Sequence, residues 1–202
     1  MLETDDLPLI IAIGLILLST IIFYLKKPEK NDSIIFNRRS ITKYNNKKVS
    51  DIIINRAISA AILAPNHFLT EPWRFYLCGK KTRDRLINLN LEKKDYFEKI
   101  PYWMVVTLKS KYAVYEKLYY EDYSACSCAI QNFMLSLSSD NVGSKWVTGA
   151  LGIKDSEILN QINCSVGEKF MGVIWFGYPH VDSHIAKTPE RKLGKKVFKI
   201  LD

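Results

Sequence analysis

The 202-residue sequence is poor in the residues on which metal sites and disulfide frameworks depend. It contains three histidines and four cysteines, with no CxxC pair and no histidine–cysteine spacing typical of zinc. Four cysteines are also too few for a disulfide framework in a chain of this length. We therefore expect no metal site, and a reduced compartment.

Several catalytic and nucleotide-binding signatures are missing as well. The glycine patterns GxGxxG and GxxxxGK[ST], which bring a phosphate to a helix N-terminus, do not occur. HExxH, GxSxG and clusters of paired carboxylates are also absent. These absences argue against Rossmann-type or P-loop phosphate binding and against hydrolytic chemistry.

The overall composition is typical of a packed globular protein, with 48% hydrophobic and 25% charged residues. The length suits one domain with a short appendage. A net charge of +8 suggests phosphate ligands, anionic lipid or nucleic acid as partners, without choosing among them. Because the lysines are scattered and no basic motif bearing aromatic residues occurs, we expect no nucleic-acid binding.

One long hydrophobic run stands near the start of the chain. Residues 7–25 contain no charged side chain, and a helix rising about 1.5 Å per residue would let them span the hydrocarbon core of a bilayer. The residues before the run are acidic, which disfavours a cleaved signal peptide. We predict a tail over residues 1–6, a transmembrane helix over 7–25, a polar linker over 26–33 and one domain over 34–202.

The charges beside this run predict its orientation. Acidic residues precede it, and Lys26, Lys27 and Lys30 follow it. The positive-inside rule then predicts a single-pass membrane protein with its N-terminus outside or in the lumen and its domain in the cytoplasm. Residues 1–25 carry three acids and no Lys or Arg, so the remaining chain has a net charge of +11. Such a domain would be attracted to an anionic leaflet.

Helical and strand patterns alternate through the domain. The run at 102–108 is apolar throughout, as in a strand buried on both faces. We expect an α+β sandwich in which helices flank a central sheet. The expected helices cover residues 50–63, 82–91, 123–138 and 155–162, and the expected strands cover 73–78, 102–108 and 170–176.

Four short stretches are candidates for chemistry. Arg38, Arg39 and Ser40 combine two guanidinium groups with a hydroxyl, and guanidinium binds phosphate in a bidentate manner. Taken alone, that stretch is more typical of a solvated basic turn. The other stretches are a loop with two prolines over 64–75, the residues 146–149 after the long helix, and a basic stretch over 188–192.

In their order and spacing, these stretches resemble the nitroreductase-like FMN flavoprotein family, in its compact single-domain branch. The matching segments run through nearly the whole domain: Arg38-Arg39-Ser40 with Tyr44, APNHFLTEPWRF at 64–75, IPYWMVVTL at 100–108, Asp122 with the small-residue helix at 124–137, GSKWVTG at 143–149, FGYP at 176–179 and PERK at 189–192.

The resemblance implies an α+β sandwich with a mainly antiparallel central sheet, assembled as a homodimer. It also implies two FMN sites at the subunit interface, each built from both chains. It assigns contacts with the FMN phosphate and ribityl chain to Arg38, Arg39 and Ser40. Arg191 is implied to add positive charge beside the same phosphate.

At the ring end of the cofactor, the resemblance implies that Trp146, Val147 and Thr148 run along the isoalloxazine ring. The hydroxyl or backbone of Thr148 would lie near the flavin N5. His67 is implied to approach the flavin from the partner subunit. Thr42 stands where many members carry Arg or Lys, and Val147 replaces a polar or basic residue of some relatives.

The implied activity is an NAD(P)H oxidoreductase with a ping-pong mechanism. NADH or NADPH would reduce FMN, and a small-molecule electron acceptor such as a nitroaromatic, a quinone or a related electrophile would then be reduced. The cofactor would carry the chemistry, so no catalytic side chain is expected.

Two alternatives remain at this point. An iodotyrosine deiodinase-like reductive dehalogenase would share the anchor and the TEPW block, and Glu92 and Tyr96 could belong to its lid. However, only four residues separate Tyr96 from Pro101, which leaves no room for a long lid. The departures at Thr42 and Val147 also keep open a non-catalytic, membrane-anchored flavin-binding protein.

Overall fold

The computed structural model describes residues 14–15, 34–111, 116–181, 183 and 197–201. The chain divides into two compact units, Met1–Asn37 and Arg38–Asp202. In the first unit, α2 (Ile34–Asn37) is a four-residue helix with exposed side chains. The predicted anchor over 7–25 lies outside the described residues except for Gly14 and Leu15. Among the helices that are described, none has the length and apolar character to cross a membrane.

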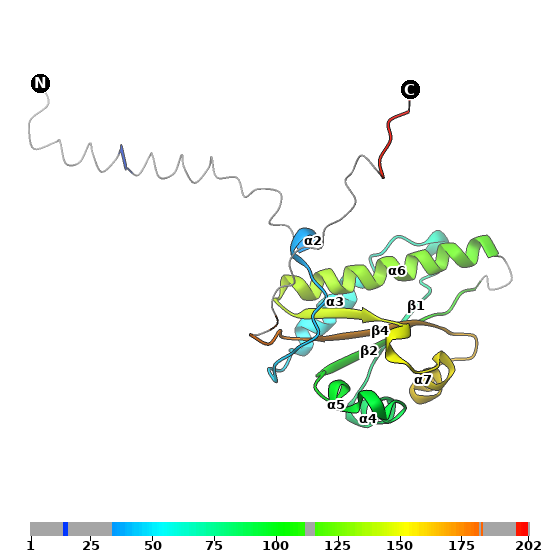
Figure 1. The fold of residues 1–202 in the computed structure, drawn as a ribbon. Coiled ribbons are helices and arrows are strands. Elements are labelled where there is room, and N and C mark those ends of the chain that lie inside the picture. Colours follow the sequence, from blue (N-terminus) through cyan, green and yellow to red (C-terminus); the bar gives the residue numbers. More distant parts are fainter. Residues whose placement is uncertain (1–13, 16–33, 112–115, 182, 184–196, 202) are drawn as a thin grey trace, which may run out of the picture. The chain divides into compact units, whose positions relative to one another are not determined.

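The second unit is built around an antiparallel sheet (Figure 1). Its strand order is β1-β2-β4-β3, and all three neighbouring pairs are antiparallel, as the resemblance implied. Within the described residues the strands are β1 (Trp73–Leu77), β2 (Tyr102–Leu108), β3 (Gly143–Val147) and β4 (Lys169–Gly177).

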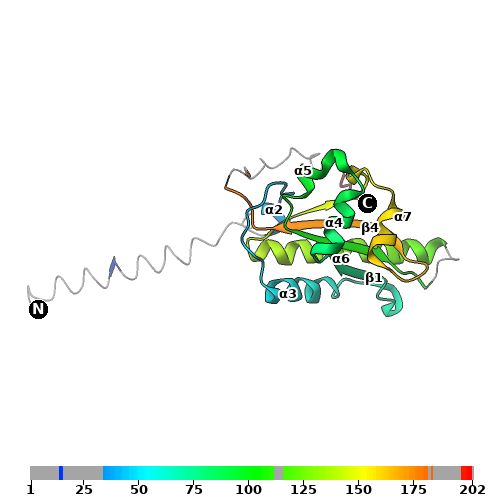
Figure 2. The ribbon, with the colours of Figure 1, turned by 90° about the horizontal axis from the view of Figure 1, so that it is seen from below.

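Helices cover both faces of this sheet (Figures 1 and 2). One face is covered by α3 (Asp51–Ala61) and α6 (Glu116–Ser139), and the other by α4 (Lys80–Asn88), α5 (Lys94–Phe97) and α7 (Asp155–Ile162). Short 3-10 turns, η3 (His67–Leu69), η4 (Leu91–Lys93) and η5 (Gly149–Leu151), lie between the larger elements.

The apolar run of β2 supplies the core on both sides of the sheet. Successive side chains of a strand point to opposite faces. Met104 and Val106 accordingly belong to the cluster beneath α3 and α6, whereas Trp103 and Val105 belong to the cluster beneath α4, α5 and α7. All four side chains are at most 2% exposed. The prediction of a strand buried on both faces is therefore confirmed.

Element boundaries agree with the sequence patterns where the apolar pattern is strong. The bounds of β2 and α7 match the predicted ranges, and α6 extends further toward the N-terminus than the predicted 123–138. The strand β3 was not predicted, because its residues GSKWV show no sustained apolar alternation. It is an edge strand, and its pairing with β4 compensates for its weak local preference.

A segment over residues 38–49 crosses one end of the sheet. Its contacts run from the edge inward: Ser40 bridges Ser144 of β3, Tyr44 bridges Pro179 after β4, and the Val49 N–H donates to Tyr102 Oη of β2 at 3.2 Å. The buried Tyr44 hydroxyl also donates to the Ile41 carbonyl at 2.7 Å. This segment therefore holds the basic stretch at its start against the edge of the sheet.

A buried carboxylate joins the opposite end of β4 to its neighbours. Glu168 is 6% exposed and accepts hydrogen bonds from Tyr76 Oη at 2.8 and 2.9 Å, from the Thr107 hydroxyl, and from the Ser165 N–H at 3.1 Å. Burial alone would raise the pKa of Glu168, but these hydrogen bonds outweigh it, so the pKa is lowered. Burial and the bonded carboxylate raise the pKa of Tyr76 to about 12, which keeps this donor protonated.

We predict that Glu168→Gln lowers the free energy of unfolding at pH 7 by about 1–3 kcal/mol, the usual cost of disrupting hydrogen bonds to a buried charged group. A carboxyl whose pKa is lowered by folding stabilises the protein above its unfolded pKa of about 4.3, and this contribution is lost as pH falls through the folded pKa. The difference from wild type should therefore shrink between pH 5 and 3. Denaturant unfolding across this range measures it.

The exposed Glu92 provides the matched control, because Glu92→Gln removes the same charge outside this network. It should leave the free energy of unfolding within about 0.5 kcal/mol of wild type. A Glu168→Gln deficit that stays constant from pH 7 to 3 would contradict the role assigned to the ionised carboxylate.

Candidate functional site

The edge strand β3 brings together two of the stretches singled out in the sequence. Ser40 pairs with Ser144 near the start of β3, and the Ile41 N–H donates to the Ser144 carbonyl at 3.1 Å. Thr148 follows the last residue of the strand. At about 3.3 Å per residue, Ser144 and Thr148 are about 13 Å apart along the chain. A ligand with an anionic end and a flat ring end could lie along this distance.

The anionic end of such a ligand would meet Arg38 and Arg39, which are both half-buried. Arg39 Nη1 donates to the Arg38 carbonyl at 2.8 Å. Burial and the neighbouring Arg39 charge lower the pKa of Arg38, because both disfavour its charged form. A bound dianion would offset the repulsion between the two guanidinium groups. The exposed Ser40 hydroxyl follows Arg39 directly in the chain and offers a further donor.

The other end of β3 is shaped by the close packing of Trp146 on Gly172. Trp146 Nε1 donates to the Met171 carbonyl at 2.9 Å. Gly172 has a φ of +135°, and a Cβ there would lie 2.2 Å from Trp146 Nε1. A register shift of β4 against β2 at this level accompanies the contact. The glycine is therefore required both by its backbone conformation and by the indole ring above it.

Val147 and Thr148 differ in what they offer to a ligand. The Val147 side chain is 3% exposed and packs in the core cluster with Val173 and Leu151. Any contact of Val147 with a cofactor would therefore come from its backbone. Thr148 is exposed and stands at the N-terminus of η5, where its hydroxyl and the turn's backbone are accessible.

Two polar side chains that the sequence reasoning missed hold the turn after Thr148. Asn90 Nδ2 donates to the Leu151 carbonyl at 2.9 Å, and Lys93 Nζ donates to the Ala150 carbonyl at 2.8 Å. Both come from the η4 region, about 60 positions earlier in the chain. No local motif marks such a distant contact. Lys93 thus supplies a cation near Thr148, whereas position 42 carries a neutral Thr.

His67 lies in a different pocket, on the side of the sheet covered by α3 and α6. Its Nδ1 is 3.3 Å from Glu121 Oε2, and the pocket of about 610 Å³ is also lined by Tyr120 and Cys128. None of the other predicted cofactor residues lines this pocket. Within one chain, His67 is therefore not part of the group along β3. Arg191 lies outside the described residues.

The loop that carries His67 has an unusual backbone. Phe68, Leu69 and Glu71 have φ values of 47°, 51° and 43°, a region that non-glycine residues rarely adopt. Such conformations persist only where the surroundings impose them. Here the fully buried Asp122 of α6 accepts hydrogen bonds at 2.6 Å from both Thr70 Oγ1 and Ser110 Oγ.

Comparison with known proteins gives three findings. The model of the Nitroreductase family matches residues 35–101. YfhC of Bacillus subtilis, named as a candidate NAD(P)H nitroreductase, is 30% identical over 176 residues, which cover 78% of this chain and 89% of YfhC. The fold is shared with solved structures, including two bacterial examples.

The first of these structures is a nitroreductase-like family protein of Bacillus cereus, with a TM-score of 0.68, 24% identity, and coverage of 84% of this chain and 94% of the other. The second is a candidate nitroreductase of Desulfovibrio desulfuricans in complex with FMN, with a TM-score of 0.69, 22% identity, and coverage of 84% and 95%.

We predict that Asp122→Ala releases the loop over 66–71, because Thr70 and Ser110 lose their shared acceptor. The free energy of unfolding should fall by about 1–3 kcal/mol. Amide hydrogen exchange at 66–71 should become faster than this global loss accounts for. Asp95→Ala, which removes an exposed carboxylate outside this loop and outside α6, serves as control. Equal exchange rates at 66–71 in the two variants would show that Asp122 does not hold the loop.

Proposed function

The chain belongs to the nitroreductase family of oxidoreductases, and from this premise we propose that it is an FMN-dependent NAD(P)H oxidoreductase. Its acceptor would be a nitroaromatic, a quinone or a related electrophilic small molecule. The observation that carries the proposal is the arrangement along β3, with paired arginines at one end and the exposed Thr148 at the other.

The basic end fits a flavin phosphate. Arg38 and Arg39 are half-buried neighbours whose mutual repulsion favours a dianion between or beside them. The exposed Ser40 hydroxyl can donate to the phosphate or to a ribityl oxygen. The family pattern further implies that Arg191, which lies outside the described residues, would add positive charge beside the phosphate.

The other end fits the ring system. The Thr148 hydroxyl or the backbone N–H groups of the following turn can donate to the flavin N5. Trp146 lies two residues before Thr148, on β3. Bound FMN would supply the redox chemistry by accepting a hydride from NADH or NADPH and returning the electrons to the acceptor. The residues named here bind and orient, and none of them acts as a nucleophile.

Lys93 is proposed as the cation that favours the reduced cofactor. Reduced flavin carries negative charge on the pyrimidine part of its ring, and Thr42 cannot neutralise it. The Lys93 ammonium lies against the Ala150 carbonyl, two residues beyond Thr148. It would therefore supply positive charge near the proposed ring end, which the neutral residue at 42 does not.

The local structure gives no support to a dehalogenase with a long helical lid. Between α4 and β2 the chain forms only η4 and the four-residue α5. The Tyr96 ring packs edge-on against Trp175, with centroids 5.7 Å apart. Tyr96 is therefore engaged with a core side chain while 38% of its surface stays exposed, and it belongs to a helix of only four residues.

We also propose a homodimer in which each FMN site receives His67 from the second subunit. The end of α3, η3 and the start of α6 expose several large apolar side chains, including Leu63 and Phe68 at 80% and Leu69 at 78%. Exposed apolar surface of this kind is typical of protein interfaces. Covering it with a second copy would bring the loop over 66–71 into the interface.

Residues 7–25 remain a proposed membrane anchor on the evidence of their sequence. The absence of charge over 19 positions and the lysines that follow support one span with the enzyme domain on the cytoplasmic side. Carbonate extraction of membranes from cells that express the full chain tests this: an anchored protein stays with the lipid.

We predict that the full chain, purified in a non-ionic detergent, binds FMN and that anaerobic NADH or NADPH bleaches its visible flavin bands. Arg39→Gln should weaken FMN binding at least about tenfold, the cost of one charge-assisted hydrogen bond. Lys169→Gln, at an exposed lysine outside the site, should leave the affinity unchanged. Absorbance and fluorescence titrations measure both.

A colourless protein that takes up no FMN would overturn the proposal. Flavin that binds but stays oxidised with both nicotinamides would instead favour the non-catalytic alternative. Reoxidation of dithionite-reduced flavin by a halotyrosine, but not by nitroaromatics or quinones, would favour the dehalogenase.

For the dimer, Phe68→Asp places a charge in the exposed apolar surface and should shift the protein to monomer. FMN affinity should fall with it, because the partner's contribution to the site is lost. Val166→Asp, at a residue that is 97% exposed in the turn before β4, is the control and should stay dimeric. Sedimentation velocity measures the association state. A Phe68→Asp variant that remains dimeric would contradict this interface.

A further inference from the structure

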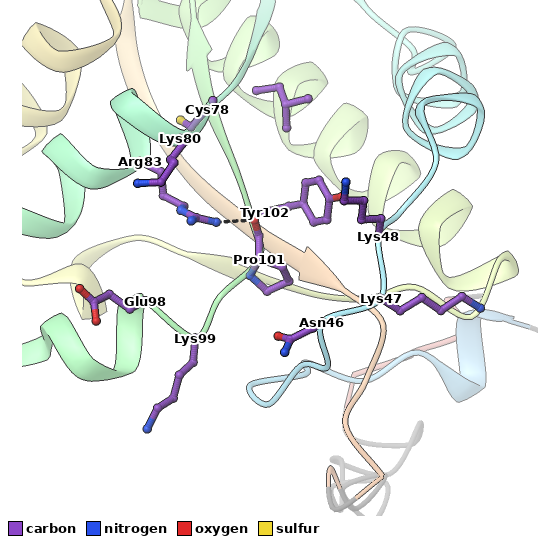
Figure 3. Close-up of a pocket in the computed structure, with 12 residues that line it drawn as sticks. Asn46, Lys47, Lys48, Cys78, Lys80, Arg83, Glu98, Lys99, Pro101 and Tyr102 are labelled. Carbon is purple, nitrogen blue, oxygen red and sulfur yellow. Dashed lines mark hydrogen bonds between the residues drawn. The ribbon is translucent and has the colours of Figure 1, made fainter.

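A cleft rich in lysine lies at the end of the sheet crossed by the segment 38–49 (Figure 3). Its volume is about 590 Å³, within the range of small-molecule sites. None of the residues proposed above for FMN lines it. Five of its lining residues are cationic and one is acidic: Lys47, Lys48, Lys80, Arg83 and Lys99, with Glu98.

Most of this positive charge has no carboxylate beside it. Lys80 is paired with Asp84 at 2.7 Å, and Glu98 lies 3.9 Å from Lys94, which does not line the cleft. For Lys48, Arg83 and Lys99, no carboxylate of the described part of the chain lies within ion-pair distance. The cleft therefore carries an uncompensated positive potential.

Arg83 is held in place at the cleft rather than extended into solvent. Its Nη1 donates to the Pro101 carbonyl at 2.8 Å, the bond drawn dashed in Figure 3. Its Nε is hidden from solvent and has no acceptor among the described residues. The guanidinium is thus held by a neutral acceptor, and no carboxylate of the described residues compensates its charge.

The first turn of α4 adds to the same potential. Its N-cap, Gly79, makes no side-chain capping bond, and the turn contains no acidic residue but has Lys80 and Lys81. Cations are unfavourable at a helix N-terminus, where the macrodipole is positive. An anion in the cleft would offset this cost.

We propose that this cleft binds a phosphate monoester, as a second anionic site that is independent of the flavin site. A guanidinium and several ammonium groups match a dianionic phosphate better than a single carboxylate. The volume exceeds that of a phosphate alone, and Leu77, Pro101 and Tyr102 give an apolar wall for an organic portion. The ester could belong to a soluble metabolite or to a lipid headgroup.

The test uses the full chain, loaded with FMN in a non-ionic detergent and titrated calorimetrically at low salt. Glycerol 3-phosphate is the soluble probe, and dihexanoyl phosphatidic acid presents the same phosphate on a lipid. Saturable binding of either probe is expected. Phosphatidic acid at least tenfold tighter identifies a lipid headgroup as the source, and equal affinities identify a soluble phosphate ester.

Single charge removals locate the site. Arg83→Gln and Lys48→Gln should each weaken binding of the tighter probe at least tenfold. Lys48 and Lys99 are exposed, so their Gln variants carry the test if Arg83→Gln fails to fold. Lys81→Gln is the matched control, because it removes a charge from the same helix turn without lining the cleft. It should change the affinity less than twofold.

Three results would overturn the proposal. The first is that neither probe binds saturably up to millimolar concentration. The second is that Lys81→Gln weakens binding as much as Lys48→Gln, which would indicate general charge attraction. The third is binding that survives Lys48→Gln but is lost in Arg39→Gln, which would assign the phosphate to the flavin site. Because the FMN content is read separately from the flavin absorbance, failure here is distinguishable from failure of the redox proposal.

Discussion

The pairing of β2 with β4 is the interaction on which the other elements depend. Both strands bury side chains on both faces, so they divide the core into two clusters and hold a helical layer against each. β4 also holds the edge strand β3, and β2 holds the end of the crossing segment through Tyr102. The candidate flavin residues along β3 are therefore positioned by β2 and β4, which supply none of these residues themselves.

Elements with a strong local apolar pattern were predicted correctly from the sequence, whereas elements that depend on distant partners were not. The bounds of β2 and α7 were predicted because their apolar periodicity comes from burial that the local sequence already encodes. The strand β3 and the contact of Lys93 with the 149–151 turn depend on partners far along the chain, so no local window contains them. The order of motifs predicted Val147 as a cofactor residue, but only the packing showed that its side chain faces the core.

The two buried acids, Glu168 and Asp122, and the cations of the described residues differ in their surroundings. Glu168 and Asp122 are buried against hydroxyl and N–H donors, with no Lys or Arg among their bonded partners in the described residues. Each carboxylate ties a strand or a loop into place. The cations of the described residues lie closer to the surface: Arg38 and Arg39 are half-buried, and Lys48 and Lys99 are exposed beside the lysine-rich cleft.

The contact between Trp146 and Gly172 constrains how the sequence can diverge. Any side chain at 172 would collide with the indole, and a smaller residue at 146 would leave a void and an unbonded Met171 carbonyl. A smaller residue at 146 would remove the collision at 172 but not the φ of +135° that disfavours a side chain there. The two positions, 26 apart in the chain, are therefore unequally constrained: the backbone and the indole both restrict 172, whereas only packing and one hydrogen bond restrict 146.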